Sequence, residues 1–320
     1  MASRKAQVDD MRAMATIGVV CIHAVAGYFL SAFGSLSWHG FNALDALCRY
    51  AVPLFLMISG MFHVGNDRYS FRSFFAKALK LFFVYAFWQL MYMLLTDKPL
   101  CIKSWIAPHY HLWFLPVIAL LYIATPLLNR WVKMGRFWVV YALVFLLMGA
   151  YSLYTGSVIR NISVLSLIGC ASYYVLGYQL QRATLPQNKW LWASLLLVSW
   201  LITAMGTCYL SQQAGQVVEC FYAYAMPNVL LGSVALFVLF MQTSSIKKGI
   251  VHKMLMPLSN YSFGIYLIHP FFIAMLYNSP YLEAYPVVKC LLTIVLSLGG
   301  GWLISWLISK IPYLSATILK

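Results

Sequence analysis

An arginine and a histidine, Arg12 and His23, stand eleven residues apart in an otherwise apolar stretch. At about 100° per residue this spacing is three helical turns plus about 20°, so both side chains project from one helix face, about 16 Å apart along the axis. Thr16 lies on the same stripe. A neutral imidazole accepts a proton near pH 7, and ionisable residues inside a membrane helix mark functional sites. The spacing predicts a general base, His23, inside a tunnel with Arg12 near its mouth. The alternative is a histidine satisfied by a neighbouring helix and an arginine that anchors the helix end.

The composition indicates that lipid surrounds most of this chain. Of its 320 residues, 62% are hydrophobic and 9% are charged, whereas soluble domains have about 25% charged residues. A membrane span needs about 20 predominantly apolar residues. This rule predicts an all-α integral membrane protein, a single bundle of about ten transmembrane helices. The expected spans are 11–33, 41–63, 75–96, 112–130, 137–154, 162–181, 189–210, 221–242, 255–277 and 287–309.

The distribution of basic residues predicts the orientation of the bundle. With ten spans both termini lie on one side of the membrane, and 17 of the 22 lysines and arginines fall on that side. Loops rich in Lys and Arg face the cytoplasm, so we expect cytoplasmic N- and C-termini. Few residues flank the first and last spans. Residues 1–320 are therefore expected to form a single transmembrane domain without a soluble extension.

The second predicted span carries an acid, a base and a helix breaker. Asp45 and Arg49 stand four residues apart near its external end and can pair along one helix face. Arg49 lies deeper and could instead face a polar cavity that binds substrate. Pro53 should kink this helix, and Ser59 precedes a glycine that permits close backbone approach.

Two other predicted spans carry polar or aromatic side chains. Ser262, Tyr266 and His269 follow an i, i+4, i+7 stripe. This stripe either borders the same water-filled cavity as the first helix or holds the bundle together by hydrogen bonds. His111 and Trp113 lead into the fourth span, where they suit a sugar site or anchor the helix at the membrane interface.

Basic clusters in the predicted cytoplasmic loops suit the phosphates of a nucleotide-containing ligand, because arginine matches phosphate geometry. Orientation alone also explains these clusters. The residues assigned to such a ligand are Arg68, Arg72, Arg136, Lys247 and Lys248. The sequence has no Walker A or GxGxxG motif, which argues against nucleotide hydrolysis and Rossmann-type binding. Its scattered histidines argue against a metal site. Cys208 and Cys220 flank one predicted external loop and could form a disulfide.

Four sequence blocks, in order, resemble the acyltransferase-3 family of integral-membrane acyltransferases. They are Asp9-Asp-Met-Arg12 followed by His23, Pro53-Leu-Phe-Leu-Met-Ile-Ser-Gly60, His111-Leu-Trp-Phe-Leu115 and Tyr261-Ser-Phe-Gly-Ile-Tyr-Leu-Ile-His-Pro270. The resemblance spans nearly the whole chain. It implies a multi-pass protein of the bacterial inner (cytoplasmic) membrane. This protein would transfer an acyl group, usually acetyl from acetyl-CoA, to a hydroxyl of a surface polysaccharide, an O-antigen or a common antigen.

The resemblance also implies roles for single residues. Arg12 and His23 would be catalytic. Substrate-binding roles would fall to Ser59, His111, Trp113, Tyr266 and His269. The implied partners are an acyl-CoA donor, an envelope glycan or lipid-linked sugar as acceptor, and membrane lipid, with no nucleic acid and no metal.

The sequence leaves two mechanisms and two functions open. His23 either deprotonates the acceptor hydroxyl as it attacks the thioester, or carries the acetyl group itself as a covalent relay. Arg12 is too far along a straight helix to touch the same atom, so we expect it to hold the pantetheine or phosphate part of the donor, or the loop at the tunnel mouth. The alternative function is a transporter or flippase for a small solute or lipid-linked sugar. Many transporters repeat a broken helix in both halves, and Pro53 has no clear counterpart half a chain later.

Overall fold

In the computed structural model, the described residues form helices, turns and irregular segments, with no strand among them. The structure describes residues 2–30, 32–66, 69–96, 99–132, 144–151, 164–242, 249–280, 282–311 and 317–319.

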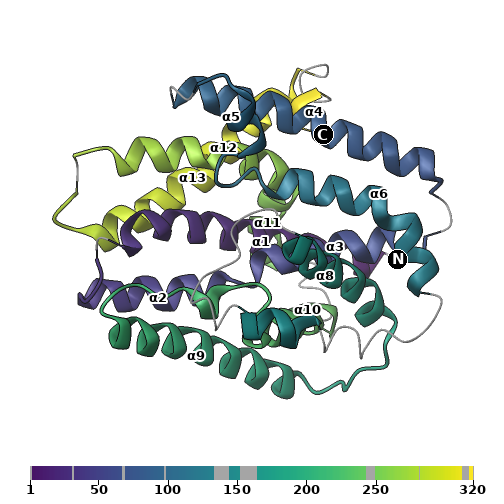
Figure 1. Ribbon diagram of the computed structural model, residues 1–320, viewed down its shortest axis with the longest axis horizontal. Coiled ribbons are helices and arrows are strands. Elements are labelled where there is room, and N and C mark those ends of the chain that lie inside the picture. The colour runs from purple at the N-terminus through teal and green to yellow at the C-terminus, as the bar shows by residue number, and fades with distance from the viewer. Residues whose placement is uncertain are drawn as a thin grey trace.

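The helices run mostly side by side along one direction (Figure 1). In chain order they are α1 (Ala2–Phe29), α2 (Leu36–Cys48), α3 (Ala51–His63), α4 (Phe71–Leu95), α5 (Ile102–Ile106), α6 (Phe114–Val132), a helix over 144–151, α8 (Val164–Arg182), α9 (Lys189–Ala214), the 3-10 turn η1 (Cys220–Tyr222), α10 (Pro227–Gln242), α11 (Ile250–Asn260), α12 (Ser262–Tyr277) and α13 (Pro286–Ser309).

Seven helical stretches of the described residues are long and apolar enough to cross a membrane. They are Ala6–Phe29, Leu36–His63, Phe71–Leu95, Phe114–Val132, Lys189–Ala214, Cys220–Gln242 and Pro286–Ser309. The predicted all-helical fold with several membrane spans is therefore confirmed. The number of ten spans and the side on which the termini lie stay predictions. Of the other three expected spans, 162–181 coincides with α8, 255–277 is divided between α11 and α12, and 137–154 falls largely outside the described residues.

Helix α1 lies at the centre of the bundle. It packs against α2, α3, α10, α11, α12 and α13, and in Figure 1 it crosses the middle of the view between α13 and α2. Met11, Ala13 and Val20 on this helix are fully buried. The stretch that carries Arg12 and His23 is thus enclosed by protein rather than by lipid.

The predicted second span is interrupted between α2 and α3. The sequence predicts a kink at Pro53, but the interruption falls one turn earlier, at residues 49–50. Proline has no N–H to donate to the carbonyl four residues before it, and its ring clashes with that carbonyl. The Arg49 carbonyl therefore loses its helical donor, and Pro53 lies in the first turn of α3, where no intrahelical donor is needed.

The predicted span 255–277 is two helices rather than one, which corrects the expectation of a continuous helix. Tyr261 separates α11 from α12 with φ −109° and ψ 15°, outside the helical region. The interruption falls in a polar run, Ser259-Asn260-Tyr261-Ser262. Serine and asparagine side chains compete with the backbone for hydrogen bonds and favour helix ends.

Helices α3 and α8 cross in direct backbone contact. A Cβ atom added at Gly60 would overlap the backbone of Tyr174, and one added at Gly177 would overlap the backbone of Met57. Small residues let membrane helices approach closely, which is how they gain packing energy without a hydrophobic driving force. The two glycines therefore fix the position of α3.

Candidate active site

One cavity of about 210 Å³ extends between Arg12 and His23. Its walls come from α1, α3, α6, α12 and the segments that precede α6 and α10. The lining residues are Arg12, Val19, His23, Val52, Phe55, His111, Trp113, Phe114, Tyr224, Ser262, Phe263 and Tyr266. Arg12 and His23 line the same cavity, as their shared helix face predicts. Both interpretations of the α12 stripe find support: Ser262 and Tyr266 border the cavity, and Tyr266 and His269 make hydrogen bonds to neighbouring segments.

His23 is partly exposed to this cavity and is hydrogen-bonded to α12. Its Nδ1 lies 2.8 Å from Nε2 of His269. The ring of Tyr110 meets His23 edge-on, with centroids 5.1 Å apart. One side of the imidazole is thus held by protein, and the cavity gives a small molecule access to the ring.

His111 is buried beside this pair and is tied to α12 through its backbone. The hydroxyl of Tyr266 donates to the His111 carbonyl oxygen at 2.6 Å. Burial lowers the pKa of the His111 imidazole well below 6.5, and the nearby His269 and His23 lower it further. His111 is therefore neutral at pH 7 and contributes hydrogen-bonding groups rather than charge.

Aromatic side chains form much of the remaining wall. The rings of Trp113 and Tyr224 lie 6.2 Å apart and are 27° from parallel. Those of Phe114 and Tyr266 are 6.1 Å apart. Ligand sites typically combine such apolar surfaces with a few placed polar groups. The cavity therefore suits a chain or ring that is mostly apolar along its sides.

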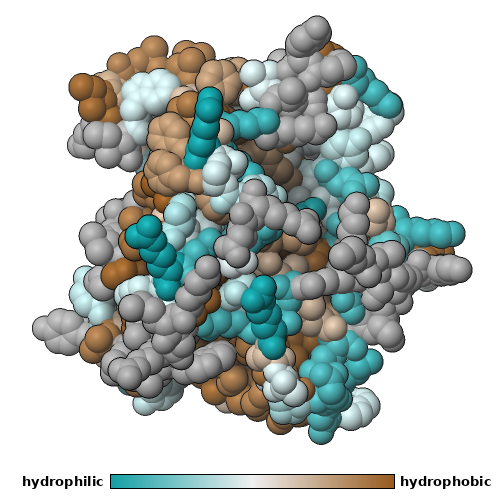
Figure 2. Space-filling model, turned by 90° about the vertical axis from the view of Figure 1, so that its right-hand side faces the viewer, coloured by the Kyte–Doolittle hydropathy of each residue, from teal (hydrophilic) through white to brown (hydrophobic). Residues whose placement is uncertain are grey.

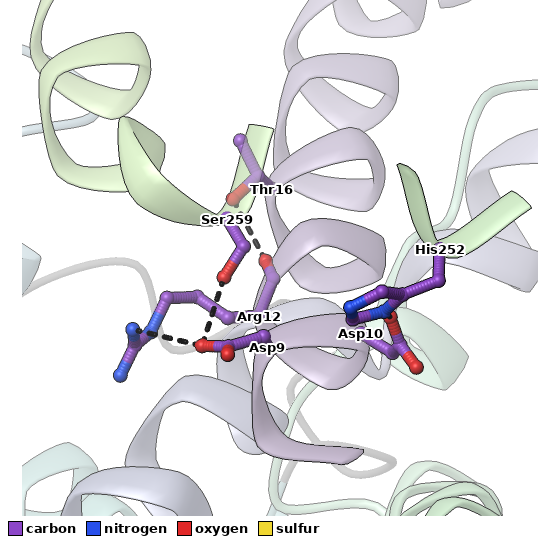
Figure 3. Close-up of polar contacts among 6 residues, drawn as sticks. All are labelled: Asp9, Asp10, Arg12, Thr16, His252 and Ser259. Carbon is purple, nitrogen blue, oxygen red and sulfur yellow. Dashed lines mark hydrogen bonds and ion pairs between the residues drawn. The ribbon is translucent and has the colours of Figure 1, made fainter. Parts of the chain in front are cut away.

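Arg12 is held at the other end of the cavity by Asp9 (Figure 3). Arg12 Nη1 lies 3.8 Å from Asp9 Oδ1, and the same carboxylate oxygen accepts a hydrogen bond from Ser259 of α11. The Arg12 side chain is 36% exposed, so it remains open to a ligand. Thr16, on the predicted stripe, donates to the Arg12 carbonyl instead and is absent from the residues that line the cavity.

A second contact fastens the start of α1 to α11. Asp10 Oδ1 lies 2.7 Å from Nδ1 of His252 (Figure 3). Together with the Asp9–Ser259 hydrogen bond, this contact fixes the first turns of α1, and so the place from which Arg12 projects.

Three predicted substrate-binding residues are placed outside the set that lines the cavity. Arg49 pairs with Asp45 at 2.5 Å, which is the first of the two arrangements that the sequence left open, and its guanidinium lies 4.1 Å from the ring centroid of Tyr222. Ser59 lies 3.3 Å from the hydroxyl of Tyr122. His269 is not among the lining residues, but it is hydrogen-bonded to His23 and its ring packs edge-on against that of His111, and both of these line the cavity.

The predicted nucleotide-binding residues are mostly beyond the described part of the chain. Arg68, Arg136, Lys247 and Lys248 lie outside the described residues. Arg72 is exposed at the start of α4. Figure 2 shows the end of the molecule at which α1 begins, where several hydrophilic side chains project between apolar ones.

Neither a disulfide nor a metal-binding group is present among the described residues. No disulfide joins any of the seven cysteines, Cys208 and Cys220 included, so the disulfide considered from the sequence is absent. Within the described ranges, no group of three His, Cys, Asp or Glu side chains is arranged to hold a metal ion.

Several residues of the cavity wall have no signal in the sequence. Tyr224 follows η1 in an irregular segment, where no helical periodicity assigns it a face. Tyr110 lies outside this lining but packs edge-on against His23, and no sequence pattern predicts that contact. Phe55 and Val52 look like ordinary apolar residues of a membrane helix.

Comparison with known proteins gives one match. A family model described as an acyltransferase domain matches residues 5–309. No curated protein and no solved structure matches the chain significantly.

Proposed function

The chain belongs to the acyltransferase family, and from this premise we propose that it moves an acetyl group from cytoplasmic acetyl-CoA to a hydroxyl of a cell-envelope saccharide. One observation carries the proposal. The cavity has an imidazole that substrate can reach, His23, and a guanidinium, Arg12, at another point of its wall. An acyl-transfer site needs a base beside the thioester and a cation for the anionic donor.

The size of the cavity indicates which part of the donor enters it. At about 210 Å³ it is smaller than the roughly 300–1,000 Å³ of pockets that enclose a whole drug-sized ligand. It suits the acyl-thioester arm, and the nucleotide would stay outside, at the end of the molecule where α1 begins. Arg12 would hold the pantetheine or a phosphate at the mouth.

In the proposed reaction His23 is a general base. It takes the proton of the acceptor hydroxyl while the hydroxyl oxygen forms a bond to the thioester carbonyl carbon. The carbon–sulfur bond breaks, and the departing sulfur receives the proton from His23. A general base of this kind contributes about 10²–10⁴ to the rate. In the competing mechanism His23 is itself acetylated, and trapping of labelled acetyl on His23 without acceptor would favour that relay.

The orientation and the remaining contacts belong to the same proposal. Cytoplasmic termini would put the end shown in Figure 2 on the side of acetyl-CoA, in a bacterial inner membrane. The nucleotide phosphates would meet Arg68, Arg72, Arg136, Lys247 and Lys248. The acceptor would contact Trp113, His111 and Tyr266 at the aromatic wall, whereas Arg49, Ser59 and His269 lie outside the cavity lining.

A short sequence block supports the choice of acceptor class. The block Tyr110-His-Leu-Trp-Phe114 is similar to that of the O-acetyltransferase of enterobacterial common antigen. We therefore propose a polysaccharide or its lipid-linked precursor as the acceptor, rather than a small soluble alcohol.

Transfer from radiolabelled acetyl-CoA to envelope glycan by the purified protein tests the proposal. We expect His23→Ala to lower kcat by about 10²–10⁴ with little change in KM for acetyl-CoA. Arg12→Ala should mainly raise that KM. His39→Ala, which changes an exposed histidine outside the cavity lining, should leave both constants unchanged. Full activity in the His23 and Arg12 variants would refute the assignment. Absence of both transfer and donor binding in the wild type would favour transport of a solute or lipid-linked sugar.

A further inference from the structure

The imidazoles of His23 and His269 meet head-on rather than face to face. Their centroids are 5.0 Å apart and their planes differ by 6°, while Nδ1 of His23 lies 2.8 Å from Nε2 of His269. The observed centroid separation equals the N···N distance plus one ring radius on each side. This equality holds only if both nitrogens lie on the line that joins the two ring centres. The two rings are therefore nearly coplanar, which is the favourable geometry for an N–H···N hydrogen bond.

The other nitrogen of His269 decides which ring donates. His269 Nδ1 lies 3.1 Å from the carbonyl oxygen of Ile265, and a carbonyl oxygen only accepts, so this nitrogen carries a proton. His269 is fully buried, and neither of its two hydrogen-bonding partners among the described residues, His23 and Ile265, is a carboxylate. A buried imidazolium without a carboxylate is costly, so the ring is neutral and its Nε2 accepts. His23 must then donate from Nδ1.

We propose that His269 is a positioning residue that holds His23 in the tautomer with the proton on Nδ1, leaving Nε2 as the basic nitrogen. This inference rests on the proposed function, in which His23 is the general base. The two nitrogens of an imidazole point away from each other, so the nitrogen that receives the substrate proton is the one turned away from His269. The tautomer of a catalytic histidine is commonly fixed by the hydrogen bond that its other nitrogen makes.

The hydrogen bond also survives each step of the transfer. The acceptor hydroxyl gives its proton to Nε2 of His23 as its oxygen bonds to the thioester carbon. His23 then carries two ring protons, and Nδ1–H still donates to His269. The Nε2 proton passes to the sulfur when the carbon–sulfur bond breaks, which restores the starting tautomer. His269 neither gains nor loses a proton, so its role is orientation.

Three substitutions at position 269 separate orientation from packing. The carbonyl of His269→Gln reaches approximately the place of the Nε2 acceptor, whereas the shorter His269→Asn reaches only the place of Nδ1, beside Ile265. His269→Phe fills the space and accepts nothing. We expect His269→Asn and His269→Phe to lower kcat about tenfold to a hundredfold, below the full loss of a general base. KM for acetyl-CoA should change little. His269→Gln should recover most of the wild-type kcat. Equal kcat values in the Gln and Asn variants would overturn the proposal.

A measurement that needs no acyl transfer completes the test. In membranes containing the wild-type protein with ¹⁵N-labelled histidine, nitrogen NMR distinguishes protonated from bare ring nitrogens, and the signals missing from His23→Ala are those of His23. We expect protonated Nδ1 and bare Nε2 in the wild type, and a tautomer mixture in His269→Phe. A proton on Nε2 of wild-type His23 would overturn the inference whatever the activity. The expected tautomer without any acyl transfer in the wild type would overturn the proposed function, and with it the catalytic purpose of the pair.

Discussion

The crossing of α3 and α8 makes Gly177→Ala an informative perturbation. A Cβ atom at position 177 would lie 2.5 Å from Cα of Met57 and closer still to its carbonyl oxygen, whereas ordinary contact begins at 3.4 Å. The neighbour is backbone, so no change of rotamer relieves the overlap, and the two helices must separate by about 1 Å. Overpacking of this kind costs about 1–3 kcal/mol. We expect the free energy of unfolding to fall by that amount and the Tm by a few degrees.

The chain offers a matched control for this variant. Gly299 lies in α13 and has no atom within 4 Å of the position of an added Cβ, so Gly299→Ala should be neutral or stabilise by up to about 1 kcal/mol through helix propensity. Thermal unfolding of both variants in detergent, followed by size-exclusion chromatography, gives the comparison. Because α3 carries Val52 and Phe55 of the cavity wall, acetyl-CoA binding should weaken in Gly177→Ala as well. The packing argument fails if Gly177→Ala melts at the same temperature as Gly299→Ala.

Three further predictions concern groups around the cavity. Asp45→Ala leaves a buried guanidinium unpaired, since the side chains of Asp45 and Arg49 are 2% and 12% exposed. The free energy of unfolding should fall by about 3–5 kcal/mol in this variant and by less in the double variant Asp45→Leu/Arg49→Met. Equal losses of stability in the two variants, measured by thermal unfolding, would contradict this. Tyr266→Phe removes the donor to the His111 carbonyl and should cost about 1–3 kcal/mol, with faster hydrogen exchange in residues 107–113; unchanged exchange there would count against the contact. Because burial lowers the pKa of His111, the unfolded chain binds the proton more readily. The stabilisation that the neutral His111 side chain provides is therefore full above about pH 6.5 and is lost as the pH falls below that value. His111→Gln should reduce the difference in Tm between pH 7.5 and pH 5.5, and an unchanged difference would exclude this contribution.

The centre of the site could be predicted from the sequence because it lies on regular helices. The spacing of Arg12 and His23 determines a shared face wherever the chain is helical, and the stripe of Ser262 and Tyr266 does the same on α12. Both predictions place side chains relative to one helix axis. They need no knowledge of how the helices pack, and the structure brings both faces to one cavity.

The rest of the site depends on packing and irregular backbone, which periodicity does not describe. His269 belongs to the predicted stripe, yet only the tertiary structure shows that it meets His23 rather than the cavity. Tyr224 reaches the wall from a segment after η1 that has no period. The interruptions at residues 49–50 and at Tyr261 fall where a proline or a polar run weakens the helix, but hydropathy alone continues across both.

Because α1 is enclosed by other helices, the proposed site would select acyl donors by their length. A helix packed against six neighbours cannot rotate or slide without disturbing all of them, so Arg12 and His23 are held about 16 Å apart along its axis. Under the proposed chemistry, this spacing would set the length of the donor arm that can reach from Arg12 to His23. Thioesters whose carbonyl falls short of the base, or overshoots it, would be rejected by length before any contact with the acyl tail could discriminate among them.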